Sequence, residues 1–144
     1  MIYHLNLNIL IEKLLSSLIK KFYDAKLTGD VVDVWGDGTA QRDFLYVKDA
    51  ASAALEIMQN LSGPVNIGSG QVYSIKEIVS EIADIADMEN SYQWNPDKPN
   101  GQDYRSYDLS KLKDTDFAPK WTLRQGLEET WDWYCQHRQS PEHC

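Results

Sequence analysis

The chain has 144 residues, 42% of them hydrophobic, which is enough to bury the core of one domain or of part of a larger one. The formal net charge of −8 argues against broad binding to nucleic acid, although a small phosphate ligand needs only a few local cations. Two cysteines at the C-terminal end are too few for a disulfide framework, and no signal peptide or uninterrupted membrane-spanning run is visible, so we expect a cytoplasmic protein with no membrane partner.

The first half of the chain predicts two helices and three short strands. Apolar residues recur every three or four positions over 7–27, which predicts an amphipathic helix that ends at the Thr28-Gly29-Asp30 turn. Asp49 is expected to cap a second helix over 50–60. Short β-branched or apolar segments predict strands at residues 31–35, 44–47 and 65–67.

The second half is dominated by two helices with capping boxes. Ser74 and Glu77 open a helix whose apolar face is Ile75, Ile78, Val79, Ile82 and Ile85. Thr122 and Gln125 open another that runs to about His137. Between them we expect an edge strand at 92–94, an irregular stretch at 95–101 and a helical turn at 108–113. Helices alternating with short strands place the chain in the α/β class, or α+β if it is taken as an isolated lobe.

We expect residues 1–144 to form a single domain with an unusual beginning. No strand or cap precedes the first helix, and three short strands make a poor sheet by themselves. The atypical start (1–16) therefore suggests a chain that begins in the middle of a fold, and the tail 138–144 is expected to be disordered.

The segment from Trp35 to Asp49 carries the strongest indication of chemistry. Trp35 offers a flat surface for a base, and Arg42 offers a donor fork suited to phosphate, on either side of a glycine-rich turn. The alternative is purely structural: Trp35 lies in the core, and Arg42 pairs with Asp43 or Asp49. From the residues alone both interpretations stay open.

A second candidate cluster lies at the C-terminus. Cys135, His137, His143 and Cys144 have ligand types that zinc prefers. The alternative is a fraying helix end, and we expect no metal site, because residues two apart diverge on a helix.

Five short motifs, followed by the segment from Leu123 to Tyr134, resemble, in order, the NAD-dependent epimerase/dehydratase family of extended short-chain dehydrogenases. The five motifs are W-G-D-G-T-A-Q-R-D-F-L-Y-V-K-D (35–49), V-N-I-G-S-G (65–70), S-I-K-E-I (74–78), D-K-P-N-G (97–101) and Y-D-L-S-K-L (107–112). The K-P-N-G and D-L-S-K-L elements are most similar to the GDP-L-fucose synthase branch.

The resemblance implies the C-terminal, nucleotide-sugar-binding lobe of an extended Rossmann fold, with a GDP-sugar preferred. Carried over to this sequence, Trp35 contacts the base, Arg42 the diphosphate, and Lys21 a phosphate. Asn100 contacts the sugar or the nucleotide, at a position where the branch usually has Asp. Lys98 either binds phosphate or braces its loop.

The same resemblance implies a half that this sequence does not contain. The family holds NAD(P) on a G-x-x-G-x-x-G loop and uses a Tyr-x-x-x-Lys pair, and neither motif occurs here. We therefore expect no catalytic residue, no NAD(P) binding and no activity in this chain alone, with a Rossmann half as its missing partner. The alternatives are an inactive nucleotide-sugar-binding module, a homodimer formed through the apolar N-terminal helix, or a folded remnant.

Overall fold

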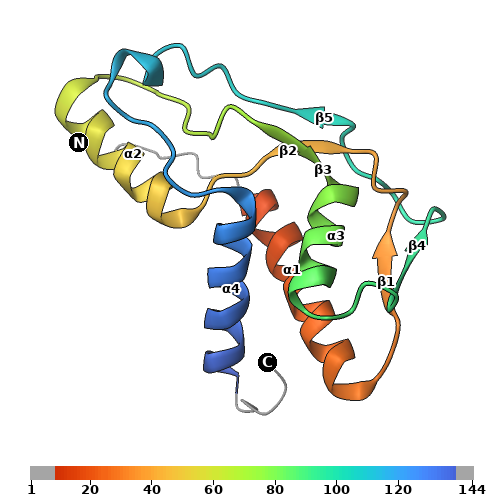
Figure 1. The fold of residues 1–144 in the computed structure, drawn as a ribbon. Coiled ribbons are helices and arrows are strands. Elements are labelled where there is room, and N and C mark those ends of the chain that lie inside the picture. The colour runs from red at the N-terminus through yellow and green to blue at the C-terminus, as the bar shows by residue number, and fades with distance from the viewer. Residues whose placement is uncertain (1–8, 139–144) are drawn as a thin grey trace.

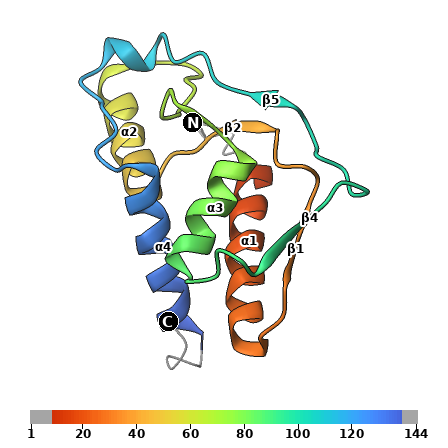
Figure 2. The same cartoon turned by 45° about the vertical axis from the view of Figure 1, so that its right-hand side comes forward.

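The computed structural model describes residues 9–138, with side chains from residue 14 onward. Three helices lie side by side and form the centre of the molecule (Figures 1 and 2). They are α1 (Ile9–Thr28), α3 (Ile75–Ile85) and α4 (Leu123–His137). The fourth helix, α2 (Val47–Asn60), stands apart from them. No helix among residues 9–138 is long and apolar enough to cross a membrane.

The strands form two small sheets beside the helices. β1 (Val32–Trp35) pairs in parallel with β4 (Tyr92–Asn95). β2 (Gln41–Asp43) lies between antiparallel β3 (Val72–Ser74) and parallel β5 (Tyr104–Arg105). A short 3₁₀ helix, η1 (Leu112–Asp114), follows β5. The α/β class predicted from the sequence is confirmed.

The core lies where the three central helices meet β1. Its largest fully buried side chains are Phe22, Ile19, Ile78, Ile82, Val34 and Val79. Tyr23 of α1 meets Trp131 and Tyr134 of α4 edge-on, with ring centroids 6.3 and 5.3 Å away. The apolar face of α1 is thus covered within the chain from Leu14 onward.

Both capping boxes are present as expected. The Ser74 hydroxyl accepts a hydrogen bond from the Glu77 backbone N–H, and the Glu77 carboxylate accepts one from the Ser74 N–H. Thr122 and Gln125 exchange the same pair of bonds at the start of α4. The helices over 7–27 and 122–137 agree with α1 and α4 to within a few residues.

Three expectations for the first half are wrong. The strand expected at 44–47 is β2 at Gln41–Asp43, because Phe44 leaves the sheet to enter the core. The segment 65–67 forms no strand, and β3 lies further along the chain. Asp49 is no cap: α2 begins earlier, and the buried Asp49 carboxylate accepts hydrogen bonds from the backbone N–H groups of Lys120 and Trp121 at 3.0–3.1 Å.

The ends of the chain extend beyond the structural description. The expectations for 1–16 and 138–144 concern mostly residues outside 9–138, and so do His143 and Cys144 of the candidate zinc cluster. Within the described part of the chain, no three His, Cys, Asp or Glu residues are grouped so that they could hold a metal ion.

Candidate functional site

Trp35 stands at the C-terminal end of β1 and points away from the core. Val32 and Val34 of the same strand are buried, whereas the Trp35 side chain is 55% exposed, as expected when successive residues face opposite sides of a strand. The structural interpretation of Trp35 as a core residue is therefore wrong. A large aromatic ring left open at a strand end is available for stacking with a ligand.

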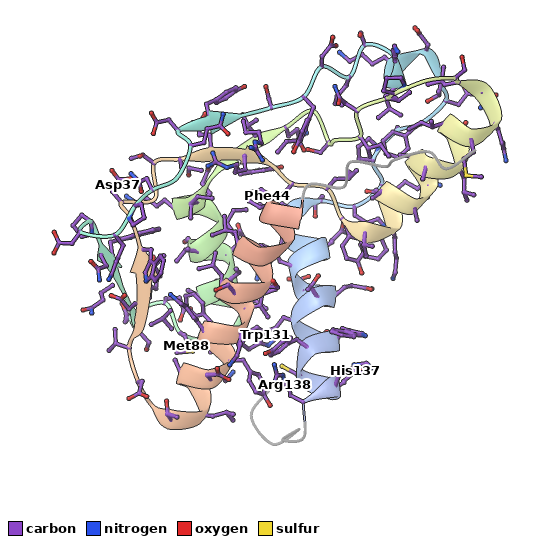
Figure 3. All side chains as sticks on the ribbon, turned by 180° about the vertical axis from the view of Figure 1, so that it is seen from behind. Asp37, Phe44, Met88, Trp131, His137 and Arg138 are labelled. Carbon is purple, nitrogen blue, oxygen red and sulfur yellow. The ribbon has the colours of Figure 1, made fainter. Side chains whose placement is uncertain are left out.

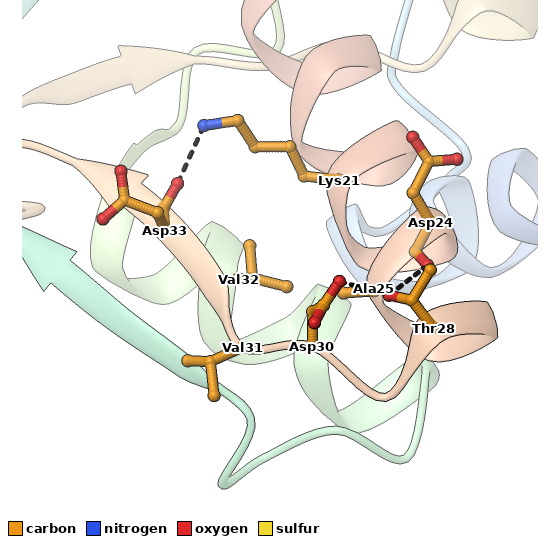
Figure 4. Close-up of a pocket in the computed structure, with 8 residues that line it drawn as sticks. All are labelled: Lys21, Asp24, Ala25, Thr28, Asp30, Val31, Val32 and Asp33. Atoms are coloured by element: carbon orange, nitrogen blue, oxygen red, sulfur yellow. Dashed lines mark hydrogen bonds between the residues drawn. The ribbon is translucent and has the colours of Figure 1, made fainter.

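Two lysines lie against this ring. The Lys21 ammonium from α1 is 5.3 Å from the Trp35 ring centroid, and the Lys98 ammonium from the loop after β4 is 5.6 Å from it. Both are within the range of cation–π attraction. The Lys21 ammonium also donates a hydrogen bond to the Asp33 carbonyl oxygen at 2.8 Å, which holds it beside the strand (Figure 4).

Lys21 also borders an open groove between α1 and β1 (Figure 4). Three carboxylates line this groove, those of Asp24, Asp30 and Asp33, against the one lysine. Such a lining repels an anion, so the groove is a poor phosphate site. The Lys21 ammonium is held at the Asp33 carbonyl oxygen and beside the Trp35 ring, where the Lys98 ammonium also lies.

Asn100 locks the turn that follows Trp35. The Asp37 backbone N–H donates to Asn100 Oδ1 at 2.8 Å, and Asn100 Nδ2 donates to Asp37 Oδ1 at 2.7 Å. A Cβ on Gly36 would lie 2.0 Å from Asn100 Oδ1, so this approach requires glycine. Hydrogen bonds from Thr39 first, and from Asn100 second, lower the pKa of Asp37 below its ordinary value. An Asp in place of Asn100 has no N–H to donate to this carboxylate.

Arg42 lies on β2 directly beside Arg105 of β5, as a register pair of parallel strands. The Arg42 guanidinium donates to the Gln41 carbonyl oxygen at 2.7 Å and passes close to Gly101, where an added Cβ would lie 3.7 Å from Arg42 Nη2. Partial burial, and then the neighbouring charge of Arg105, lower the pKa of Arg42. Among residues 14–138, neither arginine has a carboxylate within salt-bridge distance.

The suggested pairing of Arg42 with Asp43 or Asp49 is therefore wrong. The buried Asp43 carboxylate instead accepts hydrogen bonds from Ser69 N, Ser69 Oγ and Gly70 N at 2.7–2.9 Å. Asp49 is engaged by the segment before α4, as described above. Arg105 was missed from the sequence because β5 has only two residues, and nothing local indicates that it pairs with β2.

All five predicted residues thus meet at one corner of the molecule, which we call the Trp35 corner. It consists of the side chains of Lys21, Trp35, Arg42, Lys98, Asn100 and Arg105. The loop that carries Lys98 and Asn100 joins the Trp35 ring to the two arginines. Figure 3 shows Asp37 in this corner, far from His137 and Arg138 at the end of α4. Two lysines at an exposed aromatic ring and two arginines beyond the adjoining loop, in a chain of net charge −8, favour a ligand with both an aromatic and an anionic part.

Similarity to known proteins identifies the family of the chain. Residues 6–75 match the NAD dependent epimerase/dehydratase family. The chain belongs to the NAD-dependent epimerase/dehydratase family, as its motifs indicate.

Within the family the chain is similar to GDP-L-fucose synthases. It is 38% identical over 126 residues to GDP-L-fucose synthase 1 of Arabidopsis thaliana, a match that covers 85% of this chain and 39% of that protein. A crystal structure of a GDP-L-fucose synthetase from Naegleria fowleri superposes with a TM-score of 0.80 at 26% identity, over 86% of this chain and 39% of that one. A GDP-mannoheptose C4 reductase from Campylobacter jejuni gives a TM-score of 0.71 at 28% identity, over 84% and 44%. The chain thus spans about two fifths of the length of these relatives.

Proposed function

We propose that this chain is the nucleotide-sugar-binding part of an epimerase or reductase similar to GDP-L-fucose synthases, and that the Trp35 corner binds the nucleoside diphosphate. The observation that carries the proposal is the grouping, at one corner, of an exposed ring with two lysines and of two arginines beside the same loop, contributed by four parts of the chain. These segments are α1, the end of β1, β2 with β5, and the loop 95–101. A core-packing role explains neither the exposure of Trp35 nor two adjacent arginines that form no salt bridge among residues 14–138.

The roles follow from the geometry of each group. Trp35 presents a ring on which a base stacks, with Lys21 and Lys98 beside it to attract the electron-rich edge of the base or a phosphate. Arg42 and Arg105 lie next to each other at a cost in mutual repulsion, which a bound diphosphate relieves. Asn100 acts indirectly by fixing the turn at Asp37, since its amide oxygen and one amide hydrogen are already engaged there.

NAD(P) fits the described residues poorly. A pyrophosphate needs free backbone N–H groups at a glycine-rich turn that opens a helix. In the loop 68–70, the N–H groups of Ser69 and Gly70 already donate to the Asp43 carboxylate. The turn at Gly36 and Gly38 joins two strands and opens no helix. In this proposal the hydride chemistry of the family therefore lies outside these residues, and the chain contributes substrate binding.

The proposal is tested by the affinity of matched variants for GDP. Removing one charge-assisted contact to the diphosphate with Arg42→Ala should weaken binding by about 1.5–3 kcal/mol, roughly tenfold to a hundredfold. Arg105→Ala should weaken it in the same direction. Arg138→Ala, at the opposite end of the molecule, removes the same charge and should leave the affinity unchanged. Equal losses in all three variants would indicate non-specific attraction to cations and would refute the assigned site.

A further inference from the structure

Tyr134 in α4 carries a hydroxyl group that has no hydrogen-bond partner among the described residues. Its oxygen is shielded from solvent, and no other buried side-chain oxygen or nitrogen in residues 14–138 lacks a partner. The ring itself is packed, edge-on against Tyr23 of α1 with the centroids 5.3 Å apart. A shielded hydroxyl without a partner lowers stability, so almost all such groups in native proteins bond to protein, water or a ligand. The Tyr134 hydroxyl therefore indicates a position where a bonding group from outside the described chain belongs.

Tyr134 borders an open hollow between α1 and α4. The other residues that line it are Ser16, Ser17 and Lys20 of α1, and Arg138, which directly follows α4. Its volume is about 320 Å³, roughly ten times the volume that one water molecule occupies in the liquid. Figure 3 shows Arg138 at the end of α4, far from Asp37 and the Trp35 corner. We call these five lining residues the Tyr134 hollow, which is separate from the site proposed for the nucleotide.

The charge of the Tyr134 hollow is positive. The Lys20 ammonium pairs with the Asp24 carboxylate one helical turn further on. The Arg138 guanidinium lies 5.0 Å from the centroid of the Tyr134 ring and has no carboxylate within salt-bridge distance among residues 14–138. The C-terminal end of a helix carries only about half a negative elementary charge, so the full charge of Arg138 outweighs that of α4. An exposed arginine alone indicates nothing, but beside a shielded hydroxyl without a partner it indicates an anion.

We infer that the Tyr134 hollow binds a phosphate group, as inorganic phosphate or as a small phosphomonoester, with Tyr134 and Arg138 as its principal donors. A phosphate oxygen accepts the hydrogen bond that the phenol lacks, and the guanidinium fork matches two further oxygens. Ser17 and Lys20 supply donors from the α1 side. Lys20 and Arg138 are exposed and have long, flexible side chains, and the anion reaches the phenol between them.

Other occupants suit the Tyr134 hollow less well. A water molecule bonds to the phenol but leaves the charge of Arg138 uncompensated, whereas a phosphate does both. A nucleoside diphosphate needs an open aromatic face for its base. Arg138 lies over the Tyr134 ring, and Tyr23 meets the same ring edge-on, so this hollow offers no such face. The inference is therefore independent of the function proposed for the Trp35 corner.

An NMR titration of the 144-residue chain locates the bound anion. Inorganic phosphate and methyl phosphate are added separately, at fixed pH and at an ionic strength held constant with sodium chloride. The amide signals of Ser17, Lys20 and Arg138 should shift saturably, with a dissociation constant on the order of 1 mM for an open site. Tighter binding of methyl phosphate identifies the ligand as an ester, and tighter binding of the free ion identifies it as phosphate itself. Shifts confined to Arg42 and Arg105, or shifts that do not saturate, would overturn the inference.

Removal of the hydroxyl alone, with Tyr134→Phe, should have opposite effects without and with phosphate. Without phosphate the thermal midpoint should rise by about 3 °C, because the folded chain no longer shields an unpaired group. With phosphate the affinity should fall about tenfold, because the phenol no longer donates. Tyr104→Phe is the matched control: Tyr104 is 52% exposed on β5 and should change neither quantity. A lower midpoint of Tyr134→Phe without phosphate, or an unchanged phosphate affinity, would overturn the inference.

Two arginine variants separate this site from the Trp35 corner. Arg138→Ala should weaken phosphate binding at the Tyr134 hollow by about tenfold or more and leave the affinity for GDP unchanged. Arg42→Ala should weaken GDP binding and leave the phosphate shifts at Arg138 unchanged. A chain that binds phosphate at the hollow but no GDP refutes only the proposed function. A chain that binds GDP but shows no phosphate shifts at the hollow refutes only this inference.

Discussion

Replacing Gly38 with alanine should destabilise the chain through a steric clash that the structure identifies. Gly38 has φ +78° in the turn between β1 and β2, and its carbonyl oxygen accepts a hydrogen bond from the Lys76 N–H at 2.9 Å. A Cβ at this position would lie 2.6 Å from Cη2 of Trp94 and 3.0 Å from Cβ of Lys76. Neither neighbour moves easily, because Trp94 packs against the core and Lys76 lies in the first turn of α3.

The loss of unfolding free energy in Gly38→Ala has two contributions, and a matched control separates them. Gly29 has the same φ of +78°, and a Cβ there would meet nothing within 4 Å. Gly29→Ala therefore carries only the strain of a positive φ, about 1 kcal/mol. Gly38→Ala carries the same strain and in addition an overpacking cost of about 1–3 kcal/mol. Urea unfolding of both variants measures the difference, and equal losses of unfolding free energy would refute the close packing of Trp94 on this turn.

Three further predictions follow from individual contacts. Asn100→Asp should free the turn at Asp37, because two carboxylates then face each other, and faster hydrogen exchange at the Asp37 amide would show it. Asp49→Ala should lower the unfolding free energy by about 2–4 kcal/mol, since two backbone N–H groups lose their buried acceptor; a urea midpoint equal to that of the unsubstituted chain would contradict this. Hydrogen bonds lower the pKa values of Asp37, Glu77 and Glu129 in the folded chain. The ionised carboxylates therefore stabilise the folded chain above their ordinary pKa values of 3.8–4.5, and this stabilisation is lost as the pH falls through the lower folded-state values. Thermal midpoints that rise on acidification through this range would contradict the prediction.

The helices were predictable from the sequence because their signals are local. The capping boxes at Ser74 and Thr122 and the apolar spacing of α1 act within a few residues, and the structure reproduces them. The strands predicted at 31–35 and 92–94 agree with β1 and β4. The strands of the other sheet were not predictable, because their pairing is decided by distant segments. Arg105 is the clearest case: its two-residue strand exists only because β2 lies beside it.

The candidate site was predictable only in part, for the same reason. The turn after Trp35 was recognised from its glycines, and the motif around Arg42 from its resemblance to the family. Nothing local indicates that Asn100 bonds to Asp37, 63 positions away, or that Arg42 has an arginine beside it. The strand predicted at 65–67 does not form, for a different reason. Its sequence is suited to a sheet, and no strand of the described chain is placed to pair with it.

Calorimetric titration of the chain with GDP, UDP and dTDP, with NADPH for comparison, tests the central claim most directly. The Trp35 corner predicts saturable one-to-one binding of a nucleoside diphosphate, tightest for GDP, with no heat from NADPH. Binding of NADPH, or the absence of binding by all three nucleoside diphosphates, would contradict the claim that these residues form the nucleotide-sugar site.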